Sequence, residues 1–147
     1  MIYLGSDHAG FNLKRRIAAS LAKTHVPYTD VGPFALDPED DYPDYCIAVA
    51  EAVSRHKGSK GVVIGGSGIG EAIAANKVKG VRAALVYDTF TAKKSREHND
   101  ANVIALRGRG VTPATSLRLL KVWLATRFSG GARHVRRINK ITRYERR

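Results

Sequence analysis

The sequence predicts one α/β domain, residues 1–147, organised around a parallel, doubly wound sheet of five strands and ending in a basic helix and tail from about residue 131. Short apolar runs alternate with segments whose apolar residues recur every three or four positions. The length suits one core, and a hydrophobic content of 44% is ordinary for a globular protein. Right-handed crossovers between the strands are the strong default.

The expected elements alternate along the chain. Strands are predicted at residues 1–6, 28–31, 62–64, 81–86 and 102–106, and helices at about 11–22, 43–55, 72–78 and 89–98, from 113 and from 131. The first helix is supported by Leu13, Ile17 and Leu21, which repeat every four residues opposite a basic face. The central strand is supported by Val62, Val63 and Ile64, three β-branched apolar residues in a row, which indicate a strand buried on both faces.

Caps and prolines mark the helix starts. Pro43 stands where the first helical turn tolerates proline, and Asp88 with Thr89 can cap the helix that follows them. Thr112 before Pro113 is a cap followed by proline at the first helical position. One face of that helix is formed by Leu117, Leu120, Trp123 and Leu124.

Composition excludes several classes of protein. The one cysteine, Cys46, rules out an internal disulfide and a cysteine-based zinc site. It shares a helical stripe with Val49, Ala50 and Val53, which indicates a core residue rather than a nucleophile. Nothing approaches a membrane-spanning run, and the first residues lack the basic flank and apolar core of a signal peptide, so a cytoplasmic location is expected.

Basic residues concentrate towards the C-terminal end. The formal charge is +12, and residues 127–147 contain eight Arg or Lys and one acid, Glu145. A polyanion-binding surface usually adds aromatic stacking groups, and this segment offers only Phe128 and Tyr144. A solvated helix face is therefore favoured over nucleic-acid binding.

The stretch from Val62 to Glu71 carries the clearest chemical signal. A buried apolar strand runs into a glycine cluster whose backbone N–H groups can hold a phosphate or an oxyanion. Glu71 lies in the first turn of the next helix, where a carboxylate can take a proton from carbon beside a carbonyl. The spacing does not fit a dinucleotide fingerprint, a Walker loop or a nucleophile elbow. Taken alone, the cluster is equally consistent with a tight turn that has no other function.

Other strand ends carry polar residues as well. Asp7 and His8 follow the first strand, where open α/β sheets bind their ligands, although Asp7 is also a candidate helix cap. His98 and Asn99 precede the fifth strand.

Six motifs now give the chain a clear likeness to a known family. They are GSDHAGF at 5–11, DYPDY at 41–45, GSGIG at 66–70, AANK at 74–77, REHNDAN at 96–102 and GARHVRR at 131–137. Together they resemble the type B ribose-5-phosphate isomerases, within a wider family that includes galactose-6-phosphate isomerases. The likeness spans nearly the whole chain.

This resemblance implies a Rossmann-like domain with no metal and no cofactor. It implies a homodimer, in some members paired into tetramers, whose two active sites each draw residues from both subunits. The implied reaction interconverts D-ribose 5-phosphate and D-ribulose 5-phosphate through a cis-enediolate in the non-oxidative pentose phosphate pathway.

The family pattern also implies roles for individual residues. Asp7 would bind and relay protons at the sugar oxygens, and His98 would assist opening of the furanose ring. Ser67 belongs to the turn that would hold the enediolate. The phosphate would be gripped by His8, Arg109, Arg133 and Arg137, the sugar would be lined by Tyr42 and Asn99, and the anion-binding turn would comprise Gly66, Gly68, Ile69 and Gly70.

The identity of the base departs from many family members. These carry a cysteine directly before the glycine-rich turn, where this chain has Gly65. A cysteine-free branch has a glutamate just after the turn, which here is Glu71, and the resemblance implies that Glu71 is the base. Burial would raise the pKa of this carboxyl and the helix N-terminus would lower it, so the sequence leaves the direction open.

Alternative interpretations stay open at this point. His98 could balance a helix dipole, and Arg133 and Arg137, four residues apart, could be a solvated face. The substrate could be a six-carbon sugar phosphate such as allose or galactose 6-phosphate. A protein that only binds sugar phosphate or RNA is the competing class, supported by Gly65 and the charge but not by Glu71.

Overall fold

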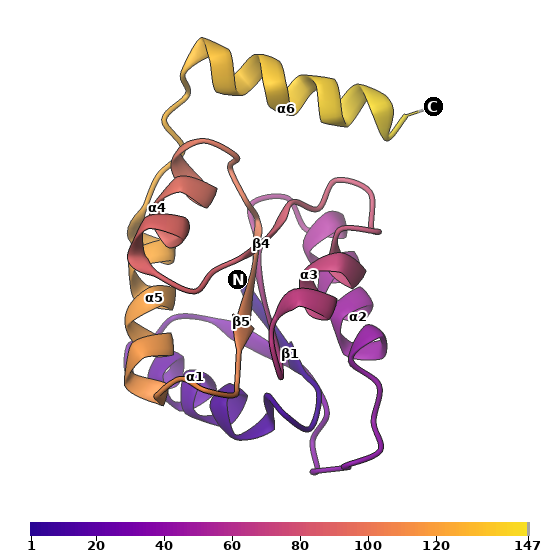
Figure 1. Cartoon of the computed structure of the whole chain (residues 1–147), viewed down its shortest axis with the longest axis vertical. Coiled ribbons are helices and arrows are strands. Elements are labelled where there is room, and N and C mark those ends of the chain that lie inside the picture. Colours follow the sequence, from indigo (N-terminus) through magenta and orange to yellow (C-terminus); the bar gives the residue numbers. More distant parts are fainter. Residues whose placement is uncertain (147) are drawn as a thin grey trace.

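A parallel five-stranded sheet forms the centre of the molecule (Figure 1). The computed structural model describes residues 1–146. The strands, in spatial order β2-β1-β3-β5-β4, are β1 (Ile2–Ser6), β2 (Tyr28–Gly32), β3 (Lys60–Gly65), β4 (Ala83–Leu85) and β5 (Val103–Arg107). The helices are α1 (Phe11–Lys23), α2 (Tyr42–Arg55), α3 (Ile69–Ala75), α4 (Thr89–Glu97), α5 (Pro113–Ala125) and α6 (Ala132–Tyr144). The predicted α/β class with a doubly wound parallel sheet is confirmed.

Helices cover both faces of the sheet. Helices α1, α4 and α5 pack on one face, and α2 and α3 pack on the other, as Figure 1 shows. Successive residues of β3 divide between the two cores: Val62 and Ile64 face the first and Val63 faces the second. This alternation explains why the strand is apolar throughout Val62–Ile64.

Cys46 belongs to the second core and is fully buried, as the helical stripe predicted. Burial raises the pKa of its thiol far above the ordinary value, so the thiolate is strongly disfavoured. The interpretation of Cys46 as a core residue is confirmed.

Helix α3 and strand β4 are shorter than predicted, and one side chain lies both where α3 ends and where β4 begins. Helix α3 ends at Ala75 rather than Val78, and β4 covers only Ala83–Leu85 of the expected 81–86. The Asn76 side chain donates to Ala72 O at 2.9 Å and pairs with both the N–H and the C=O of Ala83 at 2.8 Å. Asn76 thus ends the helix and occupies the start of the short edge strand.

A buried lysine fixes the long loop after β2. Lys14 has no exposed surface, and its ammonium donates to Asp30 at 2.6 Å and to the carbonyl of Pro33 at 2.7 Å. It also lies near the rings of Phe11 and Phe34. These contacts anchor the start of the loop that carries Asp40 towards the edge of the sheet.

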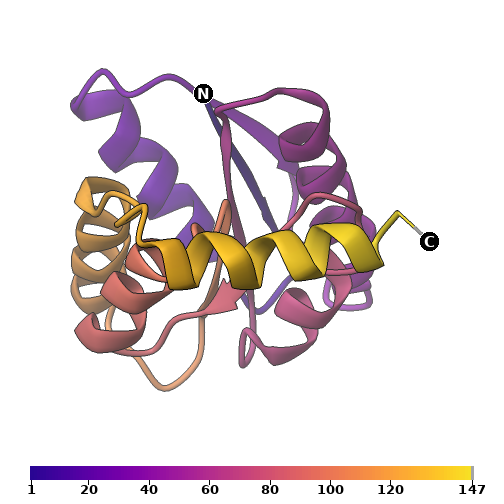
Figure 2. The ribbon, with the colours of Figure 1, turned by 90° about the horizontal axis from the view of Figure 1, so that it is seen from above.

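Helix α6 lies outside the two packed layers. It crosses over the edge of the sheet at which the strands begin (Figures 1 and 2), and none of its residues is buried. Near its C-terminal end, Glu145 accepts a 3.2 Å hydrogen bond from the N–H of Gly80. Arg147, the last residue of the predicted tail, lies outside the described residues. No helix in the described part of the chain is long and apolar enough to cross a membrane.

Candidate active site

Three turns meet at the edge of the sheet where the strands end. They follow β1, β3 and β5, and backbone hydrogen bonds connect them directly. The N–H of Asp7 donates to Ile64 O at 3.1 Å, and the N–H groups of Gly108 and Arg109 donate to Gly65 O and Gly66 O at 2.7 and 3.3 Å. Because these bonds fix the turns to one another, the side chains that they carry have defined relative positions.

The Glu71 carboxyl occupies the space beside Gly65. A Cβ placed on Gly65 would lie 1.5 Å from Glu71 Oε1, so no other residue type fits at position 65 while Glu71 keeps this conformation. The family cysteine would stand at the same position 65. The Glu71 carboxyl therefore occupies the space that a side chain at position 65 would need.

Burial changes the acidity of this carboxyl. Glu71 is only 3% exposed, and its Oε2 has no hydrogen-bond partner in the described part of the chain. Burial raises the pKa of Glu71, the negative charge of Asp7 raises it further, and backbone N–H groups at the start of α3 oppose the shift. The direction that the sequence left open is thus upward, towards the range in which a carboxylate is an effective base near neutral pH.

The turn between β3 and α3 needs glycine at its centre. Gly68 has a φ of +80°, and a Cβ there would lie 2.7 Å from Leu85 Cδ1. Ser67 Oγ accepts a 3.2 Å hydrogen bond from the N–H of Ile69. The Ile69 side chain itself is 55% exposed at the rim of the turn.

Asp7 and His8 lie beside this turn, and Asp7 has a structural role. Asp7 Oδ1 accepts a 3.0 Å hydrogen bond from the N–H of Gly10. Asp7 therefore stabilises the turn into α1, in partial agreement with the capping alternative. Its charge also raises the pKa of both Glu71 and His8.

Asp40 is a partner of His8 that sequence reasoning missed. His8 Nδ1 lies 2.7 Å from Asp40 Oδ1, and the backbone N–H of His8 donates to the same oxygen at 2.9 Å. This hydrogen bond is the main cause of a raised His8 pKa, which Arg109 opposes. In the sequence Asp40 was one of four acids in a polar loop, and nothing there distinguished it.

Tyr42 and Arg109 complete this group. The Tyr42 ring lies against Gly70, where a Cβ would be 2.7 Å from Tyr42 Cζ. Arg109 Nη1 would lie 3.7 Å from a Cβ on Gly66, so its guanidinium is close to the turn. The carboxyl edge thus brings together Asp7, His8, Tyr42, Gly66, Ser67, Gly68, Ile69, Gly70, Glu71 and Arg109.

The other four predicted residues lie at the opposite edge of the same sheet. His98 and Asn99 come after α4 and before β5, and Arg133 and Arg137 are on α6. His98 stacks on His134 of α6, with ring centroids 4.2 Å apart and planes 11° from parallel. Burial lowers the pKa of His134, and the neighbouring His98, Arg137 and Arg133 lower it further. His134 lies in the GARHVRR motif, and no role was predicted for it.

The predicted site is therefore divided between two edges within one chain. Among residues 1–146, no three His, Cys, Asp or Glu side chains converge as metal ligands. The two edges differ in their chemistry. The carboxyl edge holds a buried carboxyl beside a glycine-rich turn, and the amino edge holds exposed arginines and two stacked imidazoles.

Comparison with known proteins identifies the family. The family model described as Ribose/Galactose Isomerase matches residues 2–141. The chain belongs to this family. It is 47% identical over 145 residues to ribose-5-phosphate isomerase B of Mycolicibacterium paratuberculosis, covering 99% of this chain and 91% of that protein.

Solved structures agree with this assignment. Ribose-5-phosphate isomerase B from Mycoplasma genitalium, crystallised with bound ribulose-5-phosphate, superposes with a TM-score of 0.95 at 43% identity, covering 99% of this chain and 95% of that one. The Clostridium thermocellum enzyme gives a TM-score of 0.94 at 46% identity, covering 99% and 97%.

The seat of Glu71 beside Gly65 leads to a first prediction. Gly65→Ala adds one methyl group in the space of the carboxyl and should lower kcat about 100-fold, because the displaced base loses its alignment. Steady-state kinetics measure the loss in kcat, and a melting curve measures any change in stability that the added methyl group causes. In a Glu71→Gln background the same methyl should cost little more, since the pair acts as a unit. Additive losses would contradict the assignment.

The His8–Asp40 pair predicts a pH dependence. A general base must be ionised to act, and the pKa of Glu71 is raised from 4.5, so with Glu71 as the base the acid limb of kcat/KM should lie above the usual glutamate range. The pKa of His8 is raised from 6.5 by Asp40, so an anion held by the protonated imidazole should stay bound above that pH. Asp40→Asn should move the alkaline limb to lower pH and leave the acid limb in place. An unchanged alkaline limb would exclude this role for Asp40.

Proposed function

We propose that this chain is an aldose–ketose isomerase that interconverts D-ribose 5-phosphate and D-ribulose 5-phosphate, with Glu71 as the general base. The observation that carries the proposal is the buried Glu71 carboxyl, seated beside Gly65 at the carboxyl edge with a raised pKa. The relatives, at 43–47% identity, are named for this activity, and one was crystallised with the ketose phosphate.

The proposed chemistry moves one proton between two carbons. Glu71 takes the proton from C2 of the open-chain aldose and returns it to C1, while the enediolate oxygen is held at the turn from Gly66 to Gly70. In this proposal Asp7, beside the same turn, relays the proton that leaves the hydroxyl on C2 to the oxygen on C1. The cations of His8 and Arg109 bind the phosphate at one end of the substrate.

A homodimer supplies the rest of the site in this proposal. His98, Asn99, Arg133 and Arg137 lie at the edge opposite Glu71, so they would serve the site of a second copy. Exposed apolar side chains surround both halves: Ile69, Ile73, Tyr87 and Phe90 lie near the carboxyl edge, and Val135, Ile141 and Tyr144 lie on α6. A two-fold contact would cover these surfaces and form two equal sites. Tetramers and a cytoplasmic location are further parts of the proposal.

The test follows the purified protein with ribose 5-phosphate in heavy water beside a Glu71→Gln variant. The parent should form ribulose 5-phosphate with deuterium at C1, because the base exchanges its proton with solvent. The variant should lose about 100–10,000-fold in kcat while still binding substrate, the range for removal of a general base. Ribose 5-phosphate and the 6-phosphates of allose and galactose should be compared at equal concentration.

Two outcomes would contradict the proposal. A Glu71→Gln variant that keeps most of its rate would exclude Glu71 as the base. A parent protein that prefers a six-carbon substrate would correct the assigned sugar but leave the isomerase chemistry intact.

A further inference from the structure

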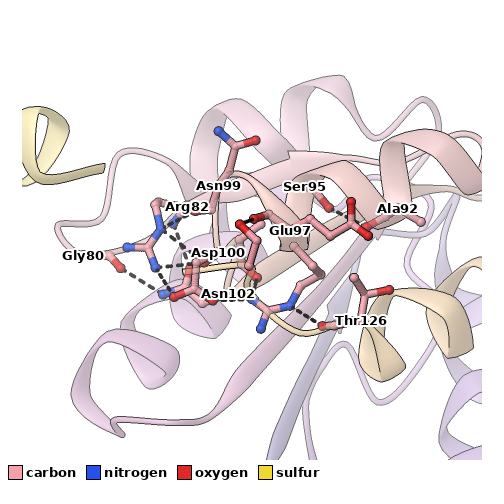
Figure 3. A network of polar contacts seen from close by, with 12 residues as sticks. Gly80, Arg82, Ala92, Ser95, Glu97, Asn99, Asp100, Asn102 and Thr126 are labelled. Carbon is pink, nitrogen blue, oxygen red and sulfur yellow. Dashed lines mark hydrogen bonds and ion pairs between the residues drawn. The ribbon is translucent and has the colours of Figure 1, made fainter. Parts of the chain in front are cut away.

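The loop between α4 and β5 is held by two arginines through one carboxylate (Figure 3). Arg96 Nη1 donates to Asp100 Oδ1 at 2.8 Å and to the carbonyl of Ala101 at 2.6 Å. Arg82 Nη2 donates to Asp100 Oδ2 at 3.3 Å and to the Asp100 carbonyl at 2.8 Å. Arg82 Nε donates to the carbonyl of Asn99 at 2.9 Å. The acceptors of all these hydrogen bonds belong to Asn99, Asp100 or Ala101, the three residues that follow His98.

The two arginines are themselves anchored in different parts of the fold. Arg96 is 8% exposed, donates to the carbonyl of Thr126 at 3.3 Å and lies over the Trp123 ring. Arg82 precedes β4, and its backbone N–H donates to Asn102 Oδ1 at 2.8 Å. The Asn102 side chain also donates to the carbonyl of Gly80. The loop is therefore tied to β4 on one side and to the end of α5 on the other, as Figure 3 shows.

The backbone of Asp100 has an unusual conformation. Its φ is +44°, a left-handed value that non-glycine residues adopt at a cost, with Asp and Asn the best tolerated. This conformation turns the chain sharply between His98 and β5. The paired arginines offset the cost by bonding both the carboxylate and the carbonyl of the same residue.

We propose that Asp100 is a positioning residue that, with Arg82 and Arg96, fixes the loop so that His98 is presented to the closed ring of the sugar. The inference rests on the proposed function, in which His98 assists ring opening at the site of a second copy. The Asp100 side chain is 39% exposed and lies outside both buried clusters, so its double pairing does more for the geometry of this loop than for the core.

Substrate chemistry separates positioning from general stability. Ribose 5-phosphate is a furanose in solution, so it must be opened before a proton can leave C2. Ribulose 5-phosphate is open-chain, because the O5 that would close a five-membered ring carries the phosphate. Solvent deuterium therefore enters C1 of ribulose 5-phosphate through Glu71 without any ring-opening step. A misplaced His98 affects the first reaction and spares the second.

The principal variant is Asp100→Asn, which keeps the shape and the tolerance for positive φ but removes the charge. We expect turnover of ribose 5-phosphate to fall about 10–100-fold, the scale of a 1 Å misplacement. Deuterium entry into C1 of ribulose 5-phosphate should stay within about twofold of the parent, because no group at the carboxyl edge has changed. His98→Asn should give the same selective pattern.

Glu51→Gln is the matched control. It removes one negative charge and another Arg–carboxylate pair of four-residue spacing, with Arg55, on the exposed face of α2. Both reactions should be unchanged in this variant. If Asp100→Asn does not fold, Arg82→Lys keeps the charge but loses the planar fork that bonds two carbonyls and the carboxylate, and it should show the same selective loss.

Other results would overturn the inference. Equal losses in both reactions would make Asp100 a structural residue only, and no loss in either would make the pairing irrelevant to the loop. A parent protein inactive in both reactions would instead refute the proposed function, and the role of Asp100 with it.

Discussion

All five strands run in the same direction, and this constraint determines where every candidate residue lies. Residues that follow a strand gather at one edge, and residues that precede a strand gather at the other. Glu71 follows β3 and His98 precedes β5, so the order of the chain places them at opposite edges. A complete site in this account needs the carboxyl edge of one copy and the amino edge of another.

At the carboxyl edge, packing and electrostatics depend on each other. The absence of a side chain at Gly65 makes room for the Glu71 carboxyl, and the same close packing removes the carboxyl from water and raises its pKa. The pKa of His8 is also raised, but for the opposite reason: the buried side chain of Asp40 stabilises its charged form, whereas burial destabilises the charged form of Glu71. One edge thus holds a carboxyl whose neutral form is favoured and an imidazole whose charged form is favoured, an arrangement that would suit proton abstraction beside a bound phosphate.

The sequence predicted what depends on local pattern. Strand and helix alternation followed from periodicity, and the placement of Cys46 and the Thr112 cap followed from spacing and residue type. The glycine-rich turn and the family resemblance together point to Glu71 from the sequence alone. Contacts made across the fold were not predictable in this way. Asp40 meets His8 across 32 residues, Asn76 shortens β4 through its side chain, and His134 stacks on His98 from a separate helix.

The direction of the pKa shift of Glu71 was likewise not predictable from the sequence. Burial and the helix N-terminus oppose each other, and only the packed geometry decides between them.

The most direct test of the divided site is complementation between two inactive variants. Glu71→Gln and His98→Asn would be co-expressed with different tags, and the mixed species would be purified and assayed with ribose 5-phosphate. Each site takes Glu71 from one chain and His98 from the other, so one site of a mixed dimer carries both substitutions and the other carries neither. The mixed dimer should therefore have about half of the parent's specific activity. A mixed species no more active than either variant alone would contradict the account, since it would mean that Glu71 and His98 act within one chain or not in the same reaction.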